Sequence, residues 1–83
     1  MEKSEIAIII PCFNEEKTIN TVVKNASYYG IPIIVDDKST DKSIENLNQI
    51  QSEIIVKSND NNIGYEKTLQ VGFEIAQKSG FKY

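Results

Sequence analysis

Two stretches of this chain share a pattern in which a run of mostly β-branched residues ends abruptly at polar ones. The first run, residues 6–10, is followed by the sequence PCFNEE, and the second, residues 31–35, is followed by DDKSTD. Unbroken runs of this kind are typical of strands buried on both faces of a parallel sheet. Because ligands of open α/β sheets bind at the carboxyl ends of such strands, the two polar segments predict the position of a site.

The rest of the chain alternates between helical and extended patterns. A third strand is predicted over residues 53–57, and the spacing of apolar residues predicts three helices. The residues expected on the inner faces of these helices are Ile19, Val22, Val23 and Ala26, then Ile44, Leu47 and Ile50, then Leu69, Gly72, Phe73 and Ala76. Gly72 is expected to let the third helix approach the sheet closely. The order βαβαβα implies a parallel sheet with right-handed crossovers.

Local signals predict where these elements begin and end. Pro11 has no N–H to donate and is expected to end the first strand. Asn14 is expected to cap the first helix, with the two glutamates after it in the first turn. Ser39 or Thr40 is expected to cap the second helix. Residues 81–83 look like the start of a further strand. We therefore expect a single α/β, Rossmann-like, three-layer domain.

The composition excludes several classes of protein. The chain has 83 residues and a net charge of −3, and all nine of its basic residues are lysine, which argues against a nucleic-acid partner. The absence of histidine removes the imidazole base and the histidine zinc ligand. Cys12, the single cysteine, cannot form an internal disulfide and is expected to be a small, partly buried residue.

The N-terminal residues do not look like a targeting segment. The apolar run after the charged start is too short for a signal peptide, and no stretch approaches the ~20 apolar residues of a spanning helix. The expected location is the cytoplasm, with membrane association in a longer form of the protein.

Asp36 and Asp37 follow the second predicted strand. Successive strand residues point to opposite faces, so only one of the two carboxylates is expected to face a ligand squarely. A carboxylate there can bind a cation or accept a hydrogen bond from a nucleobase, and it can equally cap the next helix. Phe13 can stack on a base or join the core, and Lys67 can balance a phosphate or be solvated. Gly64 belongs to neither a Walker motif nor a G-x-G-x-x-G motif.

Three segments taken together resemble the family 2 glycosyltransferases, which are inverting, nucleotide-sugar-dependent enzymes with a GT-A fold. They are residues 8–16, 34–41 and 62–72. Their details look most like the polyprenyl-phosphate sugar transferase branch. The resemblance implies that residues 1–83 form a truncated nucleotide-sugar-binding subdomain, one half of a GT-A fold. Lys38 stands where the family usually has glycine, and a lysine fits there if its φ is negative.

The resemblance also implies roles for particular residues. The nucleotide-binding residues carried over from the family are Pro11, Phe13, Glu15, Asp36, Asp37 and Lys67. Pro11 and Phe13 would line the base and ribose pocket, with the glutamate nearby. Asp37 would accept the base N–H, and Asp36 would support it or face the metal side. Lys67 lies where the family often has a basic contact to the nucleotide.

Two parts of the family's machinery are expected to be missing. Family members hold Mg²⁺ or Mn²⁺ with an Asp-x-Asp on a later strand and use a later carboxylate as general base. No aspartate follows Asp60, so neither a metal ligand nor a catalytic residue is assigned here. Without the metal and the base, we expect these 83 residues alone to transfer no sugar.

Two other interpretations are open. A signalling receiver domain also carries an Asp-Asp pair that binds Mg²⁺, but on its first strand, whereas the pair here follows the second. A non-catalytic module is the other alternative. The family sheet pairs the first strand with one that is not found here, so the apolar edge of residues 6–10 would be open. We expect that edge to drive homo-oligomer formation.

Overall fold

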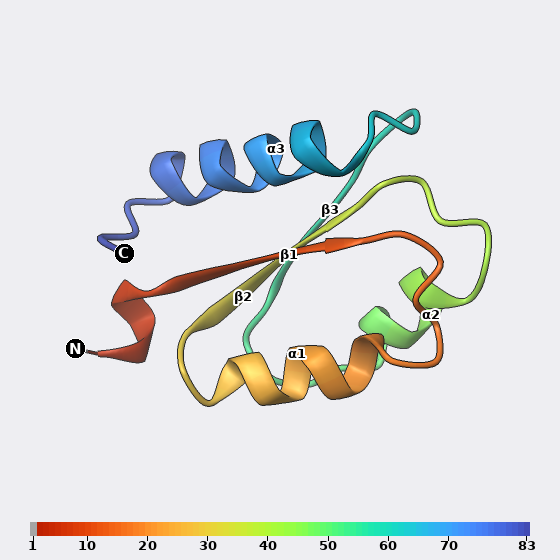
Figure 1. Cartoon of the computed structure of the whole chain (residues 1–83). Coiled ribbons are helices and arrows are strands. Elements are labelled where there is room, and N and C mark those ends of the chain that lie inside the picture. The colour runs from red at the N-terminus through yellow and green to blue at the C-terminus, as the bar shows by residue number, and fades with distance from the viewer. Residues whose placement is uncertain (1) are drawn as a thin grey trace.

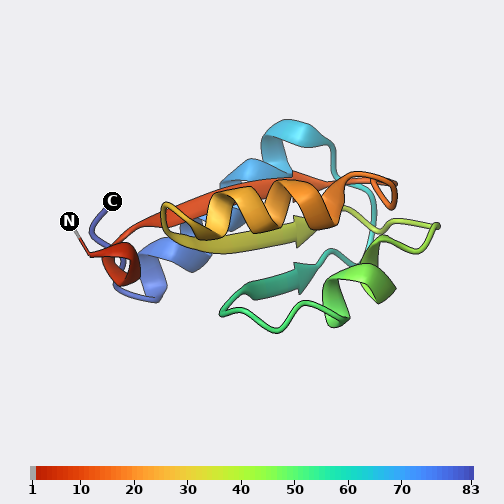
Figure 2. The same ribbon diagram turned by 90° about the horizontal axis from the view of Figure 1, so that it is seen from below.

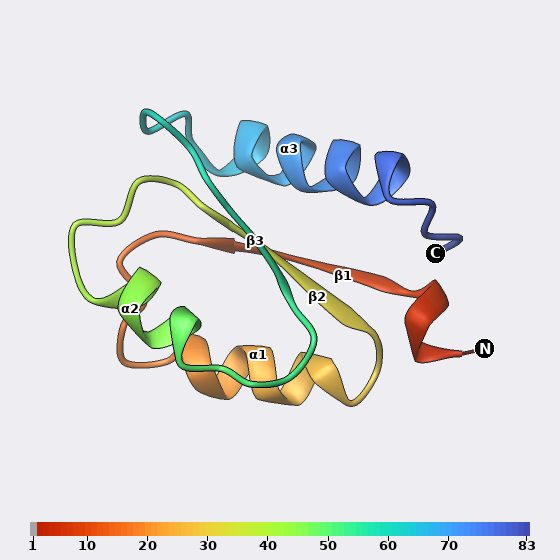
Figure 3. The same ribbon diagram turned by 180° about the vertical axis from the view of Figure 1, so that it is seen from behind.

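The polar segments after β1 and β2 lie at the same end of a three-stranded parallel sheet (Figure 1). The computed structural model describes residues 2–83. The strands are β1 (Ala7–Cys12), β2 (Ile31–Asp36) and β3 (Ile55–Ser58); the helices are α1 (Ile19–Ser27), α2 (Ser43–Asn48) and α3 (Tyr65–Lys78); and a short 3-10 turn, η1 (Lys3–Glu5), precedes β1. The strand order is β1-β2-β3. Helices α1 and α2 cover one face and α3 covers the other, which the view from behind also shows (Figure 3). The expected α/β, Rossmann-like, three-layer fold is confirmed.

β1 continues through Pro11, which was expected to end it. Pro11 lies opposite Val35 in the parallel register. The N–H of Ile31 donates to Ile6 O and the N–H of Asp37 donates to Cys12 O, each at 2.8 Å. The even-numbered residues of β1 therefore bond to β2, and the proline nitrogen faces the other edge of the strand. The prediction was wrong because no ladder hydrogen bond is lost there.

That other edge of β1 is covered at its start by Tyr83. The Ala7 N–H donates to Tyr83 O at 2.9 Å, and the Tyr83 N–H donates to Glu5 O at 3.1 Å. This is the hydrogen-bond pattern of a parallel bridge, but the structure has no strand over residues 81–83, where the start of one was expected. The prediction of a wholly open edge is therefore wrong for its first residues, and the open part begins at Ile9.

The core between the sheet and the helices α1 and α2 contains six buried residues. They are Ile10, Cys12, Ile19, Val23, Ile34 and Leu47, with Ala26, Ile44 and Ile50 among the partly buried residues packed on them. Val22 was expected on the inner face of α1 but is 44% exposed. It lies one residue before Val23, which takes the buried position, so the apolar stripe is narrower than the sequence suggests.

On the opposite face, α3 packs closely on the sheet at Gly72. A Cβ at this position would overlap the Cγ2 methyl of Ile9 and lie 3.4 Å from the Cγ2 of Val35. The expected close approach is confirmed. Phe73, however, is 59% exposed. It lies instead beside the open edge of β1, in a hollow that it shares with Ile9.

Both helices on the first face begin later than their polar signals suggest. α1 begins at Ile19 and α2 at Ser43, and neither position before them makes a side-chain capping hydrogen bond. The caps predicted for Asn14 and for Ser39 or Thr40 are therefore wrong. These side chains form hydrogen bonds between the two loops instead. β3 also begins and ends later than the predicted residues 53–57.

Candidate functional site

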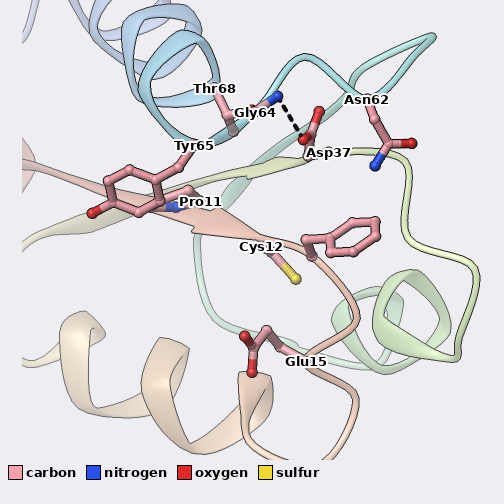
Figure 4. A pocket seen from close by; sticks show the side chains of 9 residues that line it. Pro11, Cys12, Glu15, Asp37, Asn62, Gly64, Tyr65 and Thr68 are labelled. Carbon is pink, nitrogen blue, oxygen red and sulfur yellow. Dashed lines mark hydrogen bonds between the residues drawn. The ribbon is translucent and has the colours of Figure 1, made fainter.

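A pocket of about 420 Å³ opens at the carboxyl ends of β1 and β2, beside the start of α3 (Figure 4). Its lining comes from the ends of both strands, the β1–α1 turn and the segment around the start of α3. The lining residues are Pro11, Cys12, Phe13, Glu15, Asp37, Asn62, Gly64, Tyr65 and Thr68. Two separate loops and a helix N-terminus thus converge on one hollow, as expected for an open α/β sheet.

Asp37 joins the end of β2 to the loop that leads into α3. The residue is 7% exposed. Oδ1 accepts hydrogen bonds from the Ile63 N–H at 2.8 Å and from Asn59 Nδ2 at 3.0 Å. Oδ2 accepts one from the Gly64 N–H at 3.0 Å, which is the bond drawn in Figure 4. The negative charge also lies beside the N-terminus of α3, where the helix dipole favours it.

These contacts set the protonation state of Asp37. Burial raises the pKa of the carboxyl, but the hydrogen bonds that it accepts, led by the one from the Ile63 N–H, lower the pKa by more. The net pKa lies below its ordinary value of 3.8. Asp37 is therefore an anion in the pocket at neutral pH, and it can act only as a hydrogen-bond acceptor.

Asp36 points to the other face of the sheet and does not line the pocket. It is 1% exposed, and its two oxygens accept hydrogen bonds from the N–H and the hydroxyl of Ser39. The side chain thus fixes the first turn of the β2–α2 loop. Lys38, next in this loop, has a φ of 58° and not the negative φ that would suit a lysine.

The turn after β1 brings an aromatic ring, a carboxylate and a thiol to the pocket. Phe13 is 47% exposed, and Glu15 is exposed as well. Cys12 is only 2% exposed, and burial, the largest effect, raises the pKa of its thiol to about 11. The thiol is therefore protonated at neutral pH and is not a nucleophile.

The structure brings together four of the six residues that the resemblance assigned to nucleotide binding: Pro11, Phe13, Glu15 and Asp37. Lys67 lies in the first turn of α3 but is not among the lining residues. Sequence reasoning did not assign Asn62, Tyr65 and Thr68 to the site. The Asn-rich loop and Gly64 marked the start of α3, but the residues of that helix that face the strand ends were visible only in the structure.

The residues described do not form a divalent-cation site. Among residues 2–83 there is no group of three or more His, Cys, Asp or Glu side chains placed to hold a metal ion. The oxygens of Asp36 and Asp37 already accept hydrogen bonds from protein N–H and O–H groups. The two aspartates are therefore poorly suited to bind Mg²⁺ or Mn²⁺ with the geometry seen here.

A three-layer α/β fold with a pocket at the carboxyl ends of its strands defines a ligand-binding domain of the open-sheet class. The sequence model described as glycosyl transferase family 2 matches residues 7–79, and the chain belongs to this family. The family as a whole implies a nucleotide-sugar donor.

Comparison with curated proteins finds similarity to an uncharacterized protein of Methanocaldococcus jannaschii. The two are 43% identical over 47 residues, which make up 54% of this chain and 19% of that protein. The chain thus aligns with only a small part of this relative. No solved structure gives a significant match. The comparisons offer no support for the receiver-domain interpretation or for that of a non-catalytic module. No helix within residues 2–83 is long and apolar enough to cross a membrane.

Proposed function

We propose that the pocket binds the nucleotide of a nucleotide-diphospho-sugar donor, as part of an inverting glycosyltransferase. The observation that carries this proposal is the buried, ionised carboxylate of Asp37 in the pocket lining. A carboxylate offers about four lone-pair positions. Oδ1 accepts two hydrogen bonds and Oδ2 accepts one from Gly64, so Oδ2 retains room for a ring N–H of a nucleobase.

The other lining residues supply the surface around this acceptor. Pro11 and Phe13 offer apolar area to the base and ribose, because aromatic rings stack on bases of every kind. Glu15 lies next to them on the same turn. Asp36 supports the site indirectly through Ser39. Lys67 reaches the phosphates only if its exposed side chain turns toward the pocket when the nucleotide binds.

We also propose the branch of the family to which the enzyme belongs. The motifs Asn-Glu-Glu at residues 14–16 and Gly-Tyr at residues 64–65 favour a polyprenyl-phosphate sugar transferase. The proposed location is cytoplasmic, with membrane association in a longer form. Mg²⁺ or Mn²⁺ would be held by groups other than Asp36 and Asp37, and we propose that residues 1–83 alone transfer no sugar.

The proposal is tested by NMR titration of the chain with UDP, GDP and dTDP, each with and without Mg²⁺. One nucleotide is expected to shift the amide signals of Phe13, Asp37 and Gly64. The Phe13→Ala variant is expected to weaken that binding by about tenfold, because stacking on an aromatic ring contributes ~1–3 kcal/mol per base.

The matched control for this titration is Tyr29→Ala. Tyr29 is an aromatic residue that is 71% exposed and does not line the pocket, so its loss should leave the affinity unchanged. The absence of any response to the three nucleotides would overturn the proposal, as would shifts confined to residues outside the pocket.

A second candidate function, self-association, is favoured by the open part of the β1 edge. A hollow of about 250 Å³ lies along this edge, and its lining includes Ile9, Phe73 and Phe81. Unpaired strand edges with apolar surroundings are templates for pairing with another chain. We propose that the chain forms a homo-oligomer through this edge.

A further inference from the structure

Most residues of the turn that carries Phe13 and Glu15 into the pocket are exposed. Residues 13–18 form neither helix nor strand, and the Phe13 side chain is 47% exposed. The position of both side chains therefore depends on how the backbone of the turn is fixed. This turn and the β2–α2 loop lie together at the end of the sheet opposite the two termini (Figures 1 and 2).

Three consecutive backbone N–H groups of the turn donate to side chains of the β2–α2 loop and the start of α2. Asn14 donates to Ser39 Oγ at 2.9 Å, Glu15 to Ser43 Oγ at 2.9 Å, and Glu16 to Asp41 Oδ2 at 3.2 Å. We call this set of contacts the loop clasp. Its donors and acceptors are 25 to 28 residues apart in the sequence. It therefore ties the segment after β1 to the segment after β2.

Asn14 also completes the clasp in the opposite direction. Its side-chain Oδ1 accepts a hydrogen bond from the Thr40 N–H at 2.8 Å and one from the Asp41 N–H at 3.3 Å. Its backbone has a φ of 53°, in the left-handed region that asparagine tolerates better than most residues. The Asn14 backbone thus turns the chain, and the Asn14 side chain accepts hydrogen bonds from two amides of the neighbouring loop.

We propose that Asn14 is a positioning residue for nucleotide binding, which sets the places of Phe13 and Glu15 by anchoring their turn to the β2–α2 loop. This inference rests on the proposed function of the pocket. Asn14 is itself exposed and does not line the pocket. Its side chain can therefore be changed without opening a cavity in the core or removing a group that touches the nucleotide.

The test compares Asn14→Gly with Asn14→Asp in the 83-residue chain. Glycine adopts the same positive φ without strain but removes the acceptor, whereas aspartate keeps an acceptor oxygen and tolerates the same φ. The exchange rates of the Thr40 and Asp41 amides are measured first, without ligand. Asn14→Gly should raise the Thr40 rate by about tenfold, because the loss of one hydrogen bond weakens local protection by that order. Asn14→Asp should stay within about twofold of the wild type.

The second readout is the dissociation constant for whichever of UDP, GDP and dTDP the wild-type chain binds. Asn14→Gly should raise it by about five- to tenfold, and Asn14→Asp should restore most of the affinity. Gln51→Gly is the control, because it places a glycine in another exposed loop, between α2 and β3, outside both the clasp and the pocket. It should change neither readout.

The outcomes separate the two proposals. Faster exchange with unchanged affinity in Asn14→Gly would show a purely structural clasp and overturn the positioning role. Unchanged exchange would overturn the clasp itself. Failure of the wild-type chain to bind any of the three nucleotides would overturn the proposed function, and the positioning role with it, while the exchange data would still show whether the loops are joined.

Discussion

Asp36 and Asp37 are adjacent in the sequence, but their carboxylates bind different parts of the molecule because successive strand residues point to opposite faces. Asp36 fixes the turn that begins at Ser39. Asp37 faces the pocket and holds the amides of Ile63 and Gly64. The sequence pattern predicted that only one of the two would face a ligand. It did not show that this one also anchors the start of α3.

We expect Asp37→Asn to lower the free energy of unfolding at pH 7 by about 2–4 kcal/mol, measured by urea denaturation. The amide would retain one acceptor oxygen but would direct an NH₂ group toward N–H groups that now donate to a carboxylate. The wild type should also lose stability as the pH falls below 3.8, because the pKa of Asp37 in the fold lies under that value. The unfolded state then takes up protons before the folded state does.

The variant should therefore depend less on pH in the acid range than the wild type. Some dependence should persist, because Asp41 has a lowered pKa too; burial raises it, but hydrogen bonds from Ser43 and Glu16 lower it by more. Asp60→Asn, an exposed aspartate in the polar loop, should change stability by less than ~0.5 kcal/mol. An equal effect of the two substitutions would contradict the anchoring role.

At the scale of elements, the strands could be predicted from local pattern, but the helix starts could not. The apolar runs that form β1 and β2 record burial on both faces, which is a local property. Asn14, Ser39 and Thr40 looked like helix caps because their oxygens are good acceptors for amides. In the fold those oxygens form hydrogen bonds between the two loops instead. Their partners lie about 25 residues away, so the local sequence could not predict them.

The close packing of α3 on the sheet depends on Gly72, which has no side chain. Gly72→Ala should lower the free energy of unfolding by about 1–3 kcal/mol, despite the better helix propensity of alanine, because the new methyl would overlap Ile9. Thermal or urea denaturation measures the loss. Adding Ile9→Ala should cost less in the Gly72→Ala background than alone. Glu74→Ala, on the exposed side of α3, is the control. Simple additivity of the first two substitutions would contradict the contact.

For the molecule as a whole, the sequence predicted the three layers and the end of the sheet where the pocket lies. The ends of β1 and β2 were enough to predict the position of the pocket, because parallel strands bring their carboxyl ends together. The contributions of Asn62, Tyr65 and Thr68 could not be predicted, since they depend on how α3 is placed across the sheet. The partial cover of the β1 edge by Tyr83 depends likewise on the path of the chain after α3.

This partial cover limits how the chain can self-associate. On this edge of β1, the Ala7 N–H is already bonded to Tyr83 and Pro11 has no N–H. Of the residues of β1, this leaves Ile9 with a backbone N–H available for pairing. We expect a weak, concentration-dependent homo-oligomer in sedimentation experiments. Phe73→Lys should abolish it, because Phe73 is 59% exposed and lines the hollow along this edge, and a charged side chain beside a strand edge disfavours pairing. Val56→Lys, on the edge strand β3, is the control. A wild-type chain that sediments as a monomer at high concentration would contradict self-association.

The burial of Cys12 has a practical consequence. The chain carries a single thiol, which is 2% exposed, protonated at neutral pH and part of the pocket wall. A thiol-specific reagent can reach it only when this region opens, so the rate of its modification reports that opening. Cys12 is thus a native reporter of opening at the junction between the core and the candidate site, and no further cysteine has to be introduced to measure it.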